Sequence, residues 1–97
     1  MLEGKGIRFS LGFENLDYDK MDAKLKEDLI AFSNEYGLEF GAYEDNTLYM
    51  DGEIVKNTRQ EAKSKYMSVK KELRNLLKKY DKSIKLIEEL SIFFTRL

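Results

Sequence analysis

The chain contains no cysteine, histidine, proline or tryptophan among its 97 residues. Without cysteine, it can form no disulfides, thiolate metal sites or cysteine nucleophiles. Without histidine, it also lacks the commonest general base and the usual zinc ligand. No apolar run approaches the roughly 18 residues needed to cross a bilayer, and the first residues lack the apolar core of a signal peptide. We therefore expect a cytoplasmic protein that makes no membrane contact.

What the chain does contain is enough apolar surface for one core. Apolar residues make up 42% of the sequence and aromatic residues 12%, all of them Phe or Tyr. With no proline, and no glycine after Gly52, nothing resembles an interdomain linker. A chain of this length is the size of one domain, so residues 1–97 are predicted to fold as a single unit.

The first third of the chain predicts a strand followed by a helix. Apolar and polar residues alternate over residues 7–13, the period-two pattern of a strand with one buried face. Apolar residues then recur at helical spacing, which predicts a helix near residues 19–36. Asp17 or Asp19 is placed to cap its start, and Gly37 to end it in the left-handed conformation.

The middle of the chain predicts a hairpin. Alternating apolar residues at 38–42 and 48–54 are separated by the turn-forming segment 44–47, and Gly52 is expected to interrupt the second strand.

A second helix is predicted near residues 59–81, and its start carries a capping box. The Thr58 hydroxyl is expected to accept from the Glu61 amide, while the Glu61 carboxylate reaches back. The predicted buried stripe of this helix consists of Ala62, Tyr66, Val69, Leu73, Leu76 and Tyr80.

The tail, residues 84–97, fits both periodicities. Its apolar residues share strand parity and also helix spacing, but the run Ile92-Phe93-Phe94-Thr95 favours a strand, with a bend at Glu88-Glu89 before it. The resulting βαββαβ order predicts an α+β fold, an antiparallel sheet with two helices on one face, of the ferredoxin-like or split-βαβ kind.

Nothing in the sequence predicts catalysis. The serines have no histidine to activate them, and the candidate lysines for a Ser-Lys pair all fall at exposed helix positions; they are Lys63, Lys65, Lys70 and Lys71. The adjacent acidic pairs would point to opposite faces of a strand. Asp45, Asn46 and Asp51 lack the spacing of a calcium loop. We expect no catalytic residue, metal or cofactor.

Charge is distributed very unevenly along the chain. Residues 1–53 hold thirteen acidic and five basic residues, whereas residues 54–85 hold three acidic and eleven basic ones. On a helical projection of residues 59–81, the basic residues gather on one flank of the buried stripe. This predicted cationic ridge consists of Lys63, Lys70, Lys71, Arg74 and Lys78. It predicts a binding surface for RNA phosphates or for an acidic protein; the alternative is a solvated helix face balanced by acids of the first helix.

A second interpretation uses the acidic half of the chain. A protein-only regulator or inhibitor, of the phage or antitoxin type, would bind a basic protein partner through the hairpin. The residues of this alternative patch are Tyr43, Glu44, Asp45, Tyr49, Asp51 and Glu53. Its two tyrosines would otherwise pack on each other across strands.

The order of elements also resembles a known family. The helix end at Gly37-Leu38-Glu39-Phe40-Gly41, the segment Asp51-Gly52-Glu53-Ile54 and the aromatic-ended last strand are similar to the YggL family. Its members are small bacterial proteins associated with the large ribosomal subunit. This chain differs from the family pattern at four positions, which are Ala42, Met50, Phe93 and Phe94. The resemblance implies the βαββαβ fold, no catalytic residues, and ribosomal RNA or a ribosomal protein as the partner.

Overall fold

The computed structural model describes the backbone of residues 3–96 and the side chains of residues 5–93. The elements are β1 (Glu3–Asp17), α1 (Ala23–Tyr36), β2 (Glu39–Ala42), β3 (Thr47–Lys56), α2 (Arg59–Lys78) and β4 (Lys85–Arg96). The predicted βαββαβ order is confirmed.

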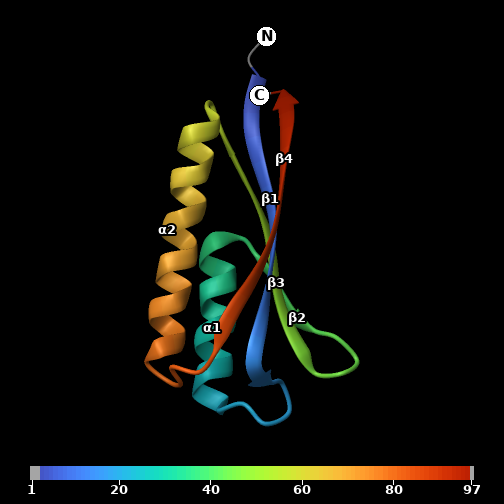
Figure 1. Ribbon diagram of the computed structural model, residues 1–97, viewed down its shortest axis with the longest axis vertical. Coiled ribbons are helices and arrows are strands. Elements are labelled where there is room, and N and C mark those ends of the chain that lie inside the picture. Colours follow the sequence, from blue (N-terminus) through green and yellow to red (C-terminus); the bar gives the residue numbers. More distant parts are fainter. Residues whose placement is uncertain (1–2, 97) are drawn as a thin grey trace.

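The four strands form one antiparallel sheet in the order β2-β3-β1-β4. The segment β1–α1–β2 places its two strands on either side of β3, and β3–α2–β4 places its strands on either side of β1, which is the split-βαβ arrangement. Both helices lie on the same face of the sheet, and the other face is open (Figure 1). The predicted α+β class is therefore confirmed.

β1 shows how the alternation in the sequence builds the core. Ile7, Phe9, Leu11 and Phe13 are buried beneath the helices, while the intervening residues lie on the open face because side chains alternate along a strand. β1 is longer than predicted and continues to Asp17. Its register with β3 shifts between Gly12 and Asp17, where Asn15 has a φ of 65°.

α1 begins later than predicted. Its N-cap is Asp22, whose carboxylate accepts hydrogen bonds from the Lys24 and Leu25 amides at 2.8 and 3.3 Å. The prediction of Asp17 or Asp19 as the cap was wrong, because β1 extends to Asp17 and a turn separates it from the helix. The C-terminal prediction is confirmed: Gly37 has a φ of 67° and closes the helix.

The predicted hairpin is confirmed, and its turn is held by its own side chains. Asp45 accepts a hydrogen bond from the Thr47 amide at 3.0 Å, and Asn46 has a φ of 67°. Gly52 was predicted to interrupt β3, but it lies within a continuous strand. A Cβ at Gly52 would come within 2.3 Å of Leu38 Cδ2, so the glycine lets β3 pack closely against Leu38.

α2 is capped largely as predicted. Thr58 Oγ accepts from the Glu61 amide at 3.1 Å, and the Glu61 carboxylate reaches back to accept from the Thr58 hydroxyl at 3.2 Å. The buried stripe holds Ala62, Tyr66, Val69, Leu73 and also Leu77. Leu76 and Tyr80, which were predicted to belong to it, are only half-buried.

The last segment is a strand. β4 runs without a break from Lys85 to Arg96 and pairs with β1 along its whole length, so the predicted bend at Glu88-Glu89 is wrong. Glu88 lies opposite Leu11 and therefore faces the helices, while Glu89 lies opposite Ser10 on the open face.

Candidate functional site

Lys70 does not belong to the exposed surface that the helical projection predicted. Its side chain is buried, with 8% of the residue exposed, and its Nζ donates to Glu88 Oε2 at 2.7 Å. The Tyr66 hydroxyl donates to the same oxygen. Residues 66, 70, 73 and 77 follow one another at spacings of four, three and four, so position 70 falls within the buried stripe. The predicted exposure of Lys70 was wrong, because Glu88 on β4 gives its ammonium group an ion-pair partner in the interior.

The Lys70–Glu88–Tyr66 cluster changes the acidity of its members. Hydrogen bonds from Lys70 and then Tyr66 lower the pKa of Glu88 below its ordinary value of 4.5. Burial, and then the hydrogen bond to Glu88, raise the pKa of Tyr66. A buried cation is tolerated only when it is paired, so this cluster fixes β4 against α2.

A pH prediction follows from the lowered pKa of Glu88. A group whose pKa is lower in the folded state adds stability above its unfolded pKa and loses it as the pH falls through the folded value. We therefore expect Glu88→Gln to destabilise the fold at neutral pH, and its melting temperature to converge with that of the wild type as the pH falls below 4.5 and through the lowered pKa of Glu88. Thermal melts across pH measure this. Glu89→Gln, on the open face, is the matched control; a Glu88→Gln deficit that persists unchanged in acid would contradict the assignment.

The other four residues of the predicted cationic ridge are exposed. They are Lys63, Lys71, Arg74 and Lys78, which we call the basic strip. The ion pairs of the described side chains involve the cations Arg8, Lys20, Lys24 and Lys70, so within residues 5–93 the basic strip has no carboxylate partner within 4.0 Å.

The basic strip lies on the side of α2 away from α1. α1 contacts the opposite flank, where the Tyr36 hydroxyl donates to Glu72 and Lys65 Nζ lies 5.3 Å from the Tyr36 ring centre. Arg74 and Lys78 instead border a depression that they share with the start of β4. The acids of α1 therefore do not neutralise the basic strip, contrary to what the alternative of a balanced helix face requires.

The alternative acidic patch is divided between two surfaces. Tyr43, Glu44 and Asp45 belong to the hairpin turn, whereas Tyr49, Asp51 and Glu53 follow β3 on the open face. The two tyrosine rings pack on each other at 4.8 Å, as expected of a cross-strand pair. Glu53 is paired with Arg8 at 2.7 Å, and Asp45 holds the turn. Structural contacts thus already occupy several members of this patch.

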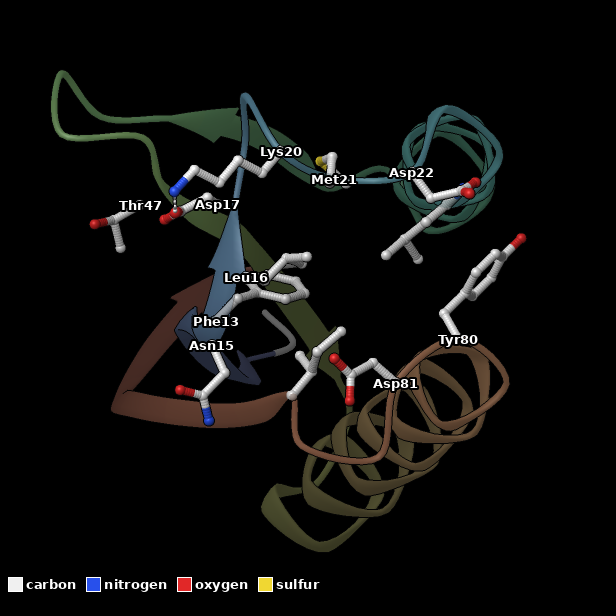
Figure 2. Close-up of a pocket in the computed structure, with 12 residues that line it drawn as sticks. Phe13, Asn15, Leu16, Asp17, Lys20, Met21, Asp22, Thr47, Tyr80 and Asp81 are labelled. Atoms are coloured by element: carbon white, nitrogen blue, oxygen red, sulfur yellow. Dashed lines mark hydrogen bonds and ion pairs between the residues drawn. The ribbon is translucent and has the colours of Figure 1, made fainter.

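A depression beside the end of β1 and the start of α1 is lined by three aspartates together with apolar side chains (Figure 2). Each carboxylate already has a partner. Asp17 pairs with Lys20 at 3.8 Å, Asp22 caps α1, and Asp81 accepts from the Ser83 amide at 2.8 Å. These contacts organise the loops, and they do not converge on a common point as catalytic carboxylates would.

Comparison with known proteins gives no relative for this chain: no family model, curated protein or solved structure matches it. None of the helices within residues 3–96 has the length and apolar character that a membrane-spanning helix requires.

Proposed function

We propose that this protein is a non-catalytic binding protein that holds RNA through the basic strip of α2. The observation that carries the proposal is the separation of charge around α2. Within residues 5–93, the exposed cations of one flank have no carboxylate partner within 4.0 Å, whereas the other flank contacts α1 through Glu72 and Lys65. Cations that are not neutralised by their own protein are the groups that bind phosphate.

The geometry of the strip supports an extended polyanion. Lys63 and Lys78 are fifteen residues apart on one helix, a distance of about 22 Å at 1.5 Å per residue. Arg74 adds a guanidinium, which binds phosphate with two parallel hydrogen bonds. A row of cations of that length fits several successive phosphates better than a single small anion.

The open face of the sheet is a poorer candidate for RNA. Many RNA-binding proteins with a comparable sheet stack bases on its aromatic residues. Here the face carries Asp51, Glu53 and Glu89, and the Phe93 ring already lies 4.9 Å from the Arg8 guanidinium carbon. Carboxylates repel the RNA backbone, so α2 is favoured over the sheet.

The resemblance to the YggL family supports ribosomal RNA as the physiological target, in a cytoplasmic protein associated with the large ribosomal subunit. That resemblance and the basic strip are independent: one comes from the pattern along most of the chain, from about Ile7 to Phe94, and the other from four side chains on one helix.

The salt dependence of binding tests the proposal. If the four strip cations neutralise four phosphates, the logarithm of the association constant should fall with the logarithm of the salt concentration at a slope of about −2.8 to −3.6. Each phosphate contributes roughly −0.7 to −0.9 to this slope. Fluorescence titrations with a fragment of ribosomal RNA at several salt concentrations measure the slope. Binding with a slope near zero, or no binding at low salt, would contradict the proposal.

A further inference from the structure

The two edges of the sheet are very different. β2 is an edge of four residues, Glu39–Ala42, whereas β4 is an edge of twelve, Lys85–Arg96 (Figure 1). Natural proteins protect edge strands by making them short, or with prolines and bulges, because an open edge offers unpaired N–H and C=O groups to another strand. β4 contains no proline and pairs with β1 without a shift in register. The one carboxylate of β4 that faces the helices, Glu88, is neutralised by Lys70, so residues 85–96 present an unbroken edge of backbone N–H and C=O groups.

An apolar groove runs beside this edge on the helix face. It has a volume of about 760 Å³ and lies between β4 and the first half of α2. Met67, Leu90 and Ile92 line it and are 51%, 50% and 48% exposed. Arg59 and Lys63 stand at its rim. These three neighbouring apolar side chains are each about half exposed beside the unpaired edge, so a partner strand could bury them.

We propose that a second copy of this chain occupies the edge, with the two β4 strands antiparallel and related by a two-fold axis at Ser91. The sheets of the two copies then join into one, with all the helices on the same face. Such strand addition takes its affinity from backbone hydrogen bonds and its specificity from alternate side chains.

The pattern of β4 is compatible with this register and disfavours an axis one residue earlier. Residues directly opposite each other in an antiparallel pair lie on the same face. With the axis at Ser91, Leu90 lies opposite the second copy's Ile92, and Ile92 opposite the second copy's Leu90. An axis at Leu90 would instead place Ile92 opposite Glu88, an aliphatic side chain against a carboxylate.

Charge also favours a second copy. Tyr66 and Lys70 both donate to Glu88 Oε2, and among residues 5–93 no other side chain donates to Glu88 Oε1. With the axis at Ser91, the second copy's Glu88 lies opposite position 94, beyond Ile92 and toward the end of the groove where Arg59 and Lys63 form the rim. Each copy thus brings a carboxylate toward the other's Arg59, a cation that does not belong to the basic strip. A net charge of −1 per chain offers little opposition to association.

Sedimentation of nuclease-treated protein over micromolar to millimolar concentrations tests the proposal. The wild type should reach twice the chain mass, and Ile92→Lys should weaken dimerisation at least tenfold. Ile30→Lys is the matched control, because Ile30 lies on α1 and is 45% exposed; it should dimerise as the wild type does. A wild type that stays monomeric throughout would overturn the proposal and leave the edge to a strand of another protein. Equal effects of the two substitutions would also overturn it.

The register has its own test, because the chain has no native cysteine. Ser91→Cys should form a disulfide-linked dimer under mild oxidation, since opposite residues have Cα atoms about 4.5–5.5 Å apart, within disulfide range. Glu89→Cys is the control: its two copies would be four residues out of register, about 13 Å apart. Equal cross-linking of both variants, or none in Ser91→Cys, would overturn the pairing. Because these experiments contain no RNA, their outcome does not bear on the RNA-binding proposal, which the salt titration tests separately.

Discussion

Replacing Leu73 by alanine is expected to lower the free energy of unfolding by roughly 2–5 kcal/mol, the usual cost of removing a buried leucine side chain. Leu73 is fully buried in the middle of the α2 stripe. It belongs to the same core cluster as Phe9, Leu11 and Leu29, so the cavity would open between α2 and the sheet. A domain of this size has a free energy of unfolding of roughly 5–15 kcal/mol in total. The loss should therefore be plain in urea denaturation.

Two neighbouring leucines provide controls for this experiment. Leu77 is 2% exposed and Leu76 is half-buried, although the sequence pattern favoured Leu76. Leu77→Ala should cost nearly as much as Leu73→Ala, and Leu76→Ala clearly less. A Leu73→Ala effect of a few tenths of a kcal/mol, or a larger loss for Leu76 than for Leu77, would contradict the position of the stripe.

The sequence predicted the elements whose signals are local. The alternation from Ile7 to Phe13, the cap at Thr58 and the left-handed Gly37 each depend on neighbouring residues, and all three are found in the structure. The start of α1 was missed because three aspartates in six residues can each cap a helix, and the choice depends on where β1 ends. β1 ends at Asp17 because of its pairing with β3 and β4, which no local pattern shows.

β4 is a second element whose structure the local sequence pattern does not determine. Residues 84–97 fit both strand parity and helix spacing, and the aromatic run favoured a strand. What settles its conformation is the pairing with β1, from Glu14 opposite Lys85 to Glu3 opposite Arg96. Those partners are more than seventy residues apart in the chain, so this interaction becomes visible only once the sheet is formed.

The sequence predicted the flank of α2 on which the exposed cations lie, but it did not predict which residues belong to that group. A projection that turns 100° per residue placed the cations on one flank of α2, and Lys63, Lys71, Arg74 and Lys78 are exposed. It could not place Lys70, because the partner of that side chain, Glu88, is on a strand eighteen residues further along. The spacing of Tyr66, Leu73 and Leu77 around position 70 was the available signal.

Reversing charges in the basic strip is expected to have the largest effect on RNA binding. Arg74→Glu together with Lys78→Glu removes two phosphate contacts and adds two repulsions. We expect affinity to fall about one hundredfold, which is about 2.8 kcal/mol at 1.4 kcal/mol per tenfold, and the salt slope to become shallower by about two. Melting should change little, because both side chains are exposed. Lys70 is excluded from this variant, since its loss would leave Glu88 without its ion-pair partner.

The central claim is that one flank of α2, and not its cationic character in general, binds RNA. The most direct measurement compares the dissociation constants of two double variants for the same ribosomal RNA fragment at the same salt concentration. One is Arg74→Glu with Lys78→Glu; the other is Lys65→Glu with Lys79→Glu, which makes the same change of charge on the flank that faces α1. The basic strip predicts about a hundredfold loss for the first and only a few-fold loss for the second. Equal losses, or a loss confined to the second variant, would contradict it.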